Sequence, residues 1–399
     1  MSQQVARQTD PITLGLIRNY LSSVADEMAN TVIRTAYSTI VRDCMDFSTA
    51  LCDRNGQTVA QGVTIPFHLG SIPFALQSTI RKYQGRIYPG DIFIINDPFD
   101  GGIHLPDIFV FQPVFFEGNL IGYSAVISHH LDVGGRVPGS AACDNTEIFH
   151  DGLRIPPLKL YERGVANEAI FQILEKNIRV PVQTLGDLRS NLAALRIGEK
   201  GMLAMAARYG AVALELYFAE LLDYTETVVR SEIRGWPDGE YSFTDYLDDD
   251  GVGAGEIPIR VKITVHGDSL TVDFTGTSPQ VRGGINSPLP FTISCCGYAV
   301  RSSMQADIPN TSGLFRPIRV IAPEASILNP VMPAASGMRG VVGFRLADAL
   351  FGAMAQIVPH RIPAAGEGGN SLIIIGGYSR ERNPFIMFDL IAGTWGARP

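Results

Sequence analysis

The stretch Ile108–His130, IFVFQPVFFEGNLIGYSAVISHH, decides the fold that we expect for this chain. Two apolar runs, Ile108–Phe116 and Leu120–Ser128, flank the turn residues Glu117-Gly118-Asn119, and this arrangement predicts a β-hairpin. The second strand ends at the pair His129-His130. A sheet fixes the backbone at a strand end while the following loop exposes side chains, so we expect ligand-binding residues there.

The segments before this hairpin predict one long helix and more strands. Asp10-Pro11 predicts a helix start, because Asp caps the first amides and Pro fits the first helical position. Apolar residues at spacings of three and four extend this amphipathic helix to about Ala36. Two short apolar runs around Asn55-Gly56 predict a second hairpin over residues 46–60, and residues 91–96 predict a buried strand.

Later segments differ in composition and in hydrophobic periodicity, and these differences predict how the chain is divided into regions. Residues 186–235 are rich in Ala and Leu and predict helices, whereas alternation from Tyr241 onward predicts β-structure. We therefore expect an α+β region carrying a metal site over residues 1–185, a helical region over 186–235 and a β-rich region over 236–399. The expected fold class is α+β, with mixed β-sheets and packed helices.

Composition excludes several classes of protein. The net charge of −8, without a Lys/Arg-rich run, argues against nucleic acid as a partner. Five cysteines without a C-x-x-C pair argue against a disulfide frame or zinc ribbon and predict a cytoplasmic protein. The first seven residues lack the apolar segment of a signal peptide. The longest apolar stretch, residues 203–222, contains Arg208, Glu215 and Glu220, so it predicts a buried amphipathic helix instead of a membrane span.

The side chains near the hairpin are of the types that bind divalent metals. His104, His129 and His130 lie close together in the sequence among several carboxylates, a set able to hold a water-activating metal. His104 and Asp107 are three residues apart, which puts both on one side of a helical or 3₁₀ turn. Adjacent strand residues point to opposite faces, so one histidine of the pair can join them, and alternation alone does not choose which.

The rest of the ligand sphere stays open at this point. Asp132 shares a face with His130 if the strand continues, and it could orient that ring. Asp43, Asp46, Asp97 and Asp100 are candidates for a further carboxylate ligand, and such a set suits Zn, Mn or Fe(II) equally well. His68 lies among apolar neighbours, which predicts a core histidine. The sequence has no phosphate-binding glycine loop and no G-x-S-x-G string, so nucleotide chemistry would have to come from a partner.

Ordered strings along nearly the whole chain resemble the hydantoinase B/oxoprolinase family. That family covers the B subunits of ATP-dependent N-methylhydantoinases and caprolactamases, the B-like part of 5-oxoprolinase, and subunits of acetone and acetophenone carboxylases. The matching strings are Met45–Ser48, Ile65–Ser71, Asn96–Asp107, Ser128–Gly135, Pro138–Ser140, Gly152–Pro157, Gly186–Leu188, Asp273–Gln280 and Asn329-Pro330.

The resemblance implies a metal site and a partner. It implies a divalent metal, Zn, Mn or Fe, bound by Asp46, His104, Asp107 and His129, which leaves His130 and Asp132 as the predicted catalytic residues. It implies a large, multi-layer subunit of a hetero-oligomer whose A-like partner binds ATP and phosphorylates a cyclic amide, such as a hydantoin, oxoproline or lactam. This chain would then open the activated ring.

Two other roles and two departures accompany the resemblance. The alternatives are a subunit of a ketone carboxylase, or a non-catalytic assembly subunit whose His/Asp cluster is structural. Asp151 stands where the family pattern leads us to expect Glu before Gly152-Leu153-Arg154. Family members are also expected to continue past Pro399, so we expect region 236–399 to be truncated relative to them.

Overall fold

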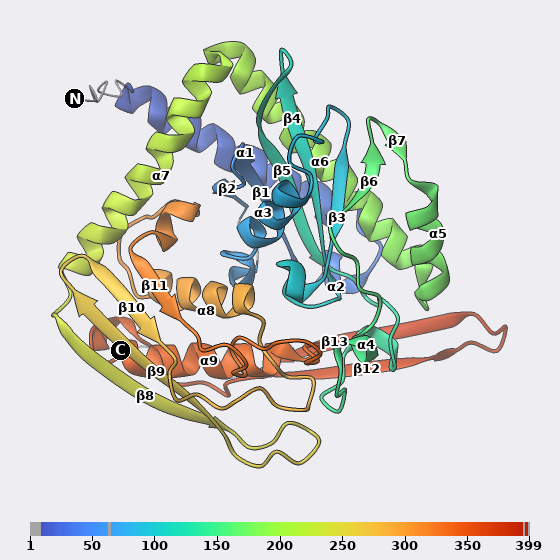
Figure 1. Ribbon diagram of the computed structural model, residues 1–399, viewed down its shortest axis with the longest axis vertical. Helices are drawn as coiled ribbons and strands as arrows, with labels where there is room; N and C mark the ends of the chain where they lie inside the picture. Colours follow the sequence, from blue (N-terminus) through green and yellow to red (C-terminus); the bar gives the residue numbers. More distant parts are fainter. Residues whose placement is uncertain (1–8, 63–64, 394–395, 398–399) are drawn as a thin grey trace.

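The predicted hairpin lies at the centre of a seven-stranded antiparallel sheet. The computed structural model describes residues 9–62, 65–393 and 396–397. In it β4 (Asp107–Phe116) pairs with β5 (Asn119–His129), and the strand order is β2-β1-β5-β4-β3-β6-β7 (Figure 1). The second predicted hairpin is β1 (Phe47–Asp53) with β2 (Thr58–Gln61). The remaining strands are β3 (Ile92–Ile95), β6 (Leu158–Glu162) and β7 (Val165–Ala166).

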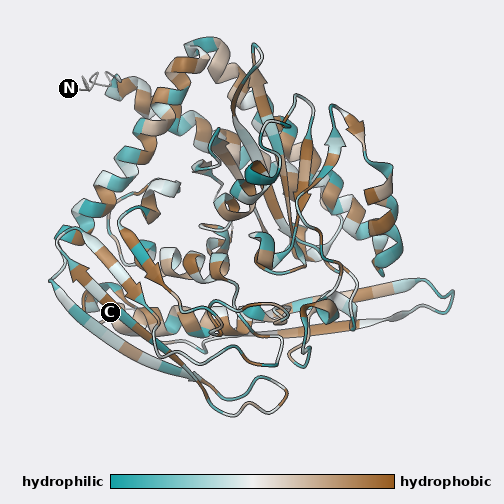
Figure 2. Cartoon of the chain, viewed as in Figure 1, coloured by the Kyte–Doolittle hydropathy of each residue, from teal (hydrophilic) through white to brown (hydrophobic). Residues whose placement is uncertain are grey.

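Both faces of this sheet are covered along its central strands, which explains why β4 has apolar residues on both of its faces. Ile108 and Val110 of β4 pack in a core with helices α1 (Pro11–Thr35) and α6 (Pro181–Tyr209). Phe109 and Phe111 point the other way and pack in a second core with α3 (Ile72–Lys82) and α8 (Leu289–Ser302). Covering both faces removes the polar alternation of a half-exposed strand, and Figure 2 shows the resulting hydrophobic strands.

The first helix confirms its sequence signals. The side chain of Asp10 accepts hydrogen bonds from the amides of Ile12 and Thr13, and Pro11 occupies the first helical position. The helix ends at Thr35, and its buried face includes Ile17 and Leu21. The cap and the apolar spacing were therefore enough to predict this element.

The apolar stretch 203–222 is two helices and not the single one predicted. Helix α6 ends at Tyr209, and α7 (Ala211–Arg234) begins after Gly210, whose φ of 82° breaks the helical path. Among the described residues, no single helix is long and apolar enough to cross a membrane; the α6–α7 pair, bent by 111°, meets the length and composition test only when taken together.

The last third of the chain contains a second sheet and two helices. The sheet has the order β11-β10-β9-β8, with β8 (Gly239–Leu247), β9 (Ile257–His266) and β10 (Ser269–Asp273) antiparallel and β11 (Ile318–Ile321) parallel to β10. The β-like texture did not predict α8 or α9 (Arg339–Met354). Most of α8 is buried, so it lacks the polar face that marks a surface helix.

The division of the chain into three regions stays a prediction. Each of the two hydrophobic cores contains residues from more than one of these regions.

The shorter elements are α2 (Thr39–Arg42), α4 (Ile148–Asp151), α5 (Glu168–Asn177) and the 3₁₀ turns Pro66–His68, Pro98–Asp100, Pro138–Ser140, Ser312–Phe315 and Pro359–Arg361.

A long hairpin, β12 (Asn370–Tyr378) with β13 (Pro384–Ala392), extends beyond the rest of the molecule (Figure 1). Phe388 on its inner face is buried. Ile375 and Met387, which pair across the two strands, are about half exposed. The hairpin therefore presents one apolar face to the molecule and another to its surroundings.

Candidate metal centre

Three of the predicted ligands form a row across neighbouring strands. The β4–β5 register places Asp107 opposite His129. On the other side of β5, Phe47 pairs with Ser128, and the amide of His129 donates to the carbonyl of Asp46 at 2.9 Å. Strand alternation puts Asp107 and His129 on the face that leads to the core containing α8. The sheet therefore gathers residues that lie far apart in the sequence.

A tightly folded loop brings His104 to this row. Gly101 has a φ of 110°, and a Cβ on Gly102 would lie 2.5 Å from the carbonyl oxygen of Asn96, so the loop needs both glycines. The Asn96 side chain donates to the carbonyl of Leu105 at 2.7 Å. The amide of Asp107 then donates to the carbonyl of His104 at 3.1 Å and closes a turn. The two side chains share one side, as predicted, with Nδ1 of His104 2.7 Å from Oδ2 of Asp107.

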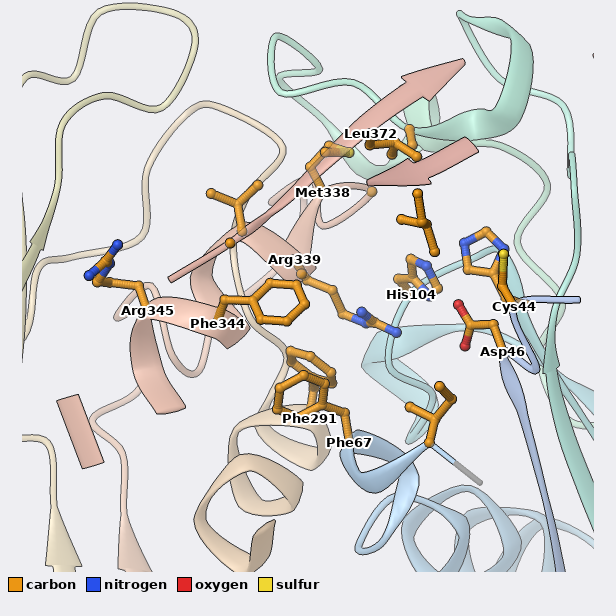
Figure 3. Close-up of a pocket in the computed structure, with 18 of the residues that line it drawn as sticks. Cys44, Asp46, Phe67, His104, Phe291, Met338, Arg339, Phe344, Arg345 and Leu372 are labelled. Carbon is orange, nitrogen blue, oxygen red and sulfur yellow. The ribbon is translucent and has the colours of Figure 1, made fainter. Parts of the chain in front are cut away.

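The four predicted ligands lie together at one end of a cavity. The ring centroids of His104 and His129 are 5.0 Å apart. Asp46, His104 and His129 line a cavity of about 380 Å³, and Asp107 is fully buried beside it (Figure 3). The structure thus brings together Asp46, His104, Asp107 and His129, although their spacing in the sequence links only His104 with Asp107.

The protonation states of His104, His129 and Asp107 are those that metal ligation needs. Burial lowers the pKa of both His104 and His129, so their rings are neutral near pH 7. Burial alone would raise the pKa of Asp107, but the adjacent ring of His104 and the positive charge of Arg339 hold it well below its usual range. Burial and the charge of Asp107 raise the pKa of Asp46 to about 7. Neutral imidazole and ionised carboxylate are the states that bind a divalent metal.

Buried polar atoms without a partner make these residues candidates for metal binding. Nδ1 of His104, Nδ1 of His129 and Oδ1 of Asp107 are buried and have no hydrogen-bond partner within the part of the chain that the structure describes. The short contact between His104 and Asp107 lacks the direction of a hydrogen bond. Buried polar atoms are normally hydrogen-bonded, so three unpartnered ones at one place are suited to a cation.

His68 lies at the site as well, which the sequence reasoning missed. It is buried, as predicted, but its Nε2 lies 3.8 Å from Oδ1 of Asp46 and its Nδ1 3.1 Å from Oγ of Ser48. Ligand atoms of Asp46, His68 and Asp107 all lie within 4.8 Å of one another. Burial lowers the pKa of His68 to about 4, so this ring too is neutral. Its apolar neighbours suggested a core residue, although its string was among those matching the family.

The other carboxylates proposed as ligands have different partners or positions. Asp43 forms an exposed ion pair with Arg42 at 2.8 Å. Asp97 pairs with Arg154 at 2.7 Å and accepts a hydrogen bond from the amide of Phe99. Neither they nor Asp100 is among the residues lining the cavity. Asp46 is therefore the candidate carboxylate that the structure places beside His104 and Asp107.

His130 and Asp132 lie outside the cavity lining. Nε2 of His130 is 3.3 Å from Oγ of Ser128, on the opposite face from His129, as alternation predicted. Strand β5 ends at His129, so the alternation does not extend to Asp132. Instead, Asp132 accepts hydrogen bonds from the amides of Gly134, Gly139 and Arg179 and from the Arg179 guanidinium. The catalytic roles of His130 and Asp132 stay a prediction, which these contacts do not support.

Arg339 completes the site from a segment that gave no local signal. It begins α9, its guanidinium contacts Oδ2 of Asp107, and it lies 4.0 Å above the ring of Phe291. Arg339 and Asp107 are 232 positions apart in the sequence. A contact over that distance depends on tertiary packing, so no spacing rule could have predicted it.

Comparison with known proteins identifies the family of this chain. Residues 10–399 match the model of the family described as hydantoinase B/oxoprolinase. The chain belongs to this family. It is 36% identical to the B component of a putative D-/L-hydantoinase from Pseudomonas sp. (strain NS671), over 98% of this chain and 69% of that protein. It is 33% identical to the beta component of the caprolactamase from Pseudomonas jessenii, over 94% of this chain and 64% of that protein.

Solved structures confirm the α+β fold of this family member. The structure of the ATP-dependent caprolactamase from Pseudomonas jessenii superposes with a TM-score of 0.87 at 31% identity, covering 96% of this chain and 66% of that one. A nucleotide-free acetone carboxylase superposes with a TM-score of 0.90 at 18% identity, over 97% of this chain and 55% of that one. At that identity the second match shows the fold alone. The chain thus spans about two thirds of its hydantoinase and caprolactamase relatives.

Proposed function

We propose that this chain is the metal-bearing subunit of an ATP-dependent cyclic amide hydrolase. It would open a hydantoin, oxoproline or lactam ring after an A-type partner has phosphorylated it. The observation that carries this proposal is the row Asp46–His129–Asp107, with His104 beside it, at one end of the cavity. The names of the relatives, components of a hydantoinase and of a caprolactamase, give the reaction class.

The cavity suits a small ring with an activated carbonyl. Asp46, His104, Asp107 and His129 would hold a divalent ion such as Zn, Mn or Fe, which when bound supplies Lewis-acid chemistry and makes water a better nucleophile. Phe67, Phe291, Phe344 and Leu372 line the cavity, so the apolar part of a ring can pack there. Neutral histidines at the polar end keep their lone pairs available for ligation.

The ATP-dependent step is assigned to the partner. The sequence contains no phosphate-binding glycine loop. An unstrained amide resists hydrolysis, and phosphorylation of its oxygen makes the ring carbon more electrophilic. Water then adds to that carbon, the C–N bond breaks to give a ring-opened acyl phosphate with a free amine, and a second water releases phosphate and leaves the carboxylate. Phosphorylation by the partner and ring opening by this chain therefore require a hetero-oligomer in which the phosphorylated substrate reaches this chain's cavity.

Co-expression with an A-type partner tests this proposal. We expect the purified complex to contain a divalent metal and to open hydantoin or lactam rings when ATP is supplied. The variant His104→Gln should lose both properties, whereas His266→Gln, which changes an exposed histidine outside the site, should retain them.

Other outcomes redirect or reject the proposal. Bicarbonate-dependent consumption of a ketone, without ring opening, would assign the complex to the ketone carboxylases. A folded, active complex that retains its metal after the His104 substitution would show that the metal is bound elsewhere. A folded complex without metal or activity would leave an assembly role.

A further inference from the structure

The first turn of helix α9 opens onto the cavity. The helix runs over 16 residues from Arg339 to Met354, and Met338 at its N-cap offers no side-chain acceptor. The amides of Arg339 and Val341 bond to the carbonyls of Ser336 and Met338. Gly340, between them, lines the cavity and has no side chain to cover its own amide. A helix N-terminus carries partial positive charge and attracts anions.

Arg339 brings a full positive charge to the same place. Its exposed fraction is 9%, and Figure 3 shows its side chain reaching into the cavity toward the metal-ligand end. One of its N–H groups is used by Asp107, but its buried Nε has no hydrogen-bond partner among the residues that the structure describes. Phe291 stacks on one side of the guanidinium and fixes its plane. A guanidinium has five N–H donors, so its single carboxylate partner leaves donors for a second anion.

The nearby arginine of the same helix has a different role. Arg345 also lines the cavity, but its guanidinium pairs with Asp245 at 3.0 Å and lies 3.7 Å from Asp348. Its charge is therefore already matched by carboxylates. Arg339 shares Asp107 with the proposed metal, so metal binding would leave this end of the cavity positively charged.

The segment before α9 is held firmly enough to keep this geometry. The buried carboxylate of Asp151 accepts hydrogen bonds from the amide of Ser336 at 2.8 Å and from the side chain of Asn145 at 2.7 Å. A Cβ on Gly337 would lie 2.9 Å from an oxygen of Asp151, so the segment passes close to that carboxylate. These contacts fix the backbone three residues before Arg339.

From this geometry we infer that Arg339 and the N-terminus of α9 form a subsite for the phosphoryl group of the activated substrate, an inference that rests on the proposed function. A phosphoryl group offers several oxygens, and a guanidinium can bind two of them at once. Because Arg339 also contacts Asp107, the subsite lies next to the proposed metal ligands.

Phosphate binding without turnover tests this subsite. We would titrate inorganic phosphate into the metal-loaded complex, without ATP, by isothermal calorimetry. The Arg339→Met variant removes the guanidinium and should bind phosphate about ten- to a hundredfold more weakly, the loss expected for hydrogen bonds to a charged group. Arg339→Lys keeps the charge but loses the fork, and should be intermediate. Arg345→Met removes a charge from the same helix and should change the affinity less than about twofold.

The outcomes separate this inference from the proposed function. Metal content and circular dichroism are measured for each variant, so that a lost metal or a misfolded chain is recognised. If Arg339→Met loses its metal or its fold, the phosphate affinity of Arg339→Lys is compared with that of the wild type instead. Wild-type affinity in a folded, metal-bearing Arg339→Met variant would overturn the subsite even if the complex opens rings. Arg339-dependent phosphate binding in a complex without ring-opening activity would instead support the subsite and count against the function.

Discussion

Replacing Asp107 with Asn should destabilise the metal-free protein strongly. Asp107 is fully buried, lies 2.7 Å from Nδ1 of His104 and pairs with the buried guanidinium of Arg339. The amide of Asn keeps the shape but removes the negative charge, so the guanidinium loses its ionic partner. Breaking a buried ion pair from one side costs about 3–5 kcal/mol. We expect about 3 kcal/mol for Asp107→Asn, because the amide oxygen can still accept one hydrogen bond.

A double-mutant cycle that combines Asp107→Asn with Arg339→Met gives a sharper test of this ion pair. Arg339→Met added to Asp107→Asn removes the unpaired charge, so the double variant should be more stable than Asp107→Asn alone by about 1–3 kcal/mol. The free energy of unfolding is measured in urea by circular dichroism after chelator treatment, since a bound metal would stabilise the variants unequally. A double variant whose loss equals the sum of the two single losses would refute the idea that these charges stabilise each other.

Three further predictions address neighbouring residues. His104→Gln should abolish metal binding, whereas His68→Gln should weaken it by about ten- to a hundredfold if His68 acts by holding Asp46; metal titration by calorimetry distinguishes these losses, and equal affinities would contradict the difference. Asp132→Asn should lower the free energy of unfolding by about 2–3 kcal/mol and leave the metal content unchanged, because the Asp132 carboxylate accepts hydrogen bonds from loop amides and from Arg179. A loss of metal without a loss of stability would instead indicate that Asp132 acts at the metal site. Burial raises the pKa of Asp151 from 3.8 to about 6, so between about pH 4 and pH 6 the folded state keeps a proton that the unfolded chain loses. Wild-type stability should therefore fall relative to Asp151→Asn as the pH rises through this window, by up to about 3 kcal/mol, and a difference that is constant with pH would refute this.

Local sequence signals predicted the elements that depend on local interactions. The cap at Asp10 and the turn at Glu117-Gly118-Asn119 each fix a backbone within a few residues, and the structure confirms the helix and hairpin that follow. The turn joining His104 to Asp107 is equally local. These features were therefore predictable without knowing the fold.

Features that depend on tertiary packing could not be predicted in this way. Helix α8 is buried on most sides, so its sequence lacks the periodic polar face that identifies a helix. The pair Arg339–Asp107 joins residues that meet because α9 packs beside the sheet. His68 had the apolar neighbours of a core residue, and the structure shows that the same core borders the metal-ligand row. The family resemblance, not spacing, linked Asp46 and His129 to the site.

The cavity has two walls that differ in local stability: one belongs to the seven-stranded sheet and the other to the hairpin β12–β13. The ligand row belongs to a seven-stranded sheet covered on both faces, whereas Leu372 and Phe388 of the opposite wall belong to a two-stranded ribbon. Such a ribbon has little stability of its own and can separate without global unfolding. Hydrogen exchange should therefore be slow at the amides of β5 and faster along β12. Local opening of this wall would leave the ligand row in place, because the row belongs to the covered sheet.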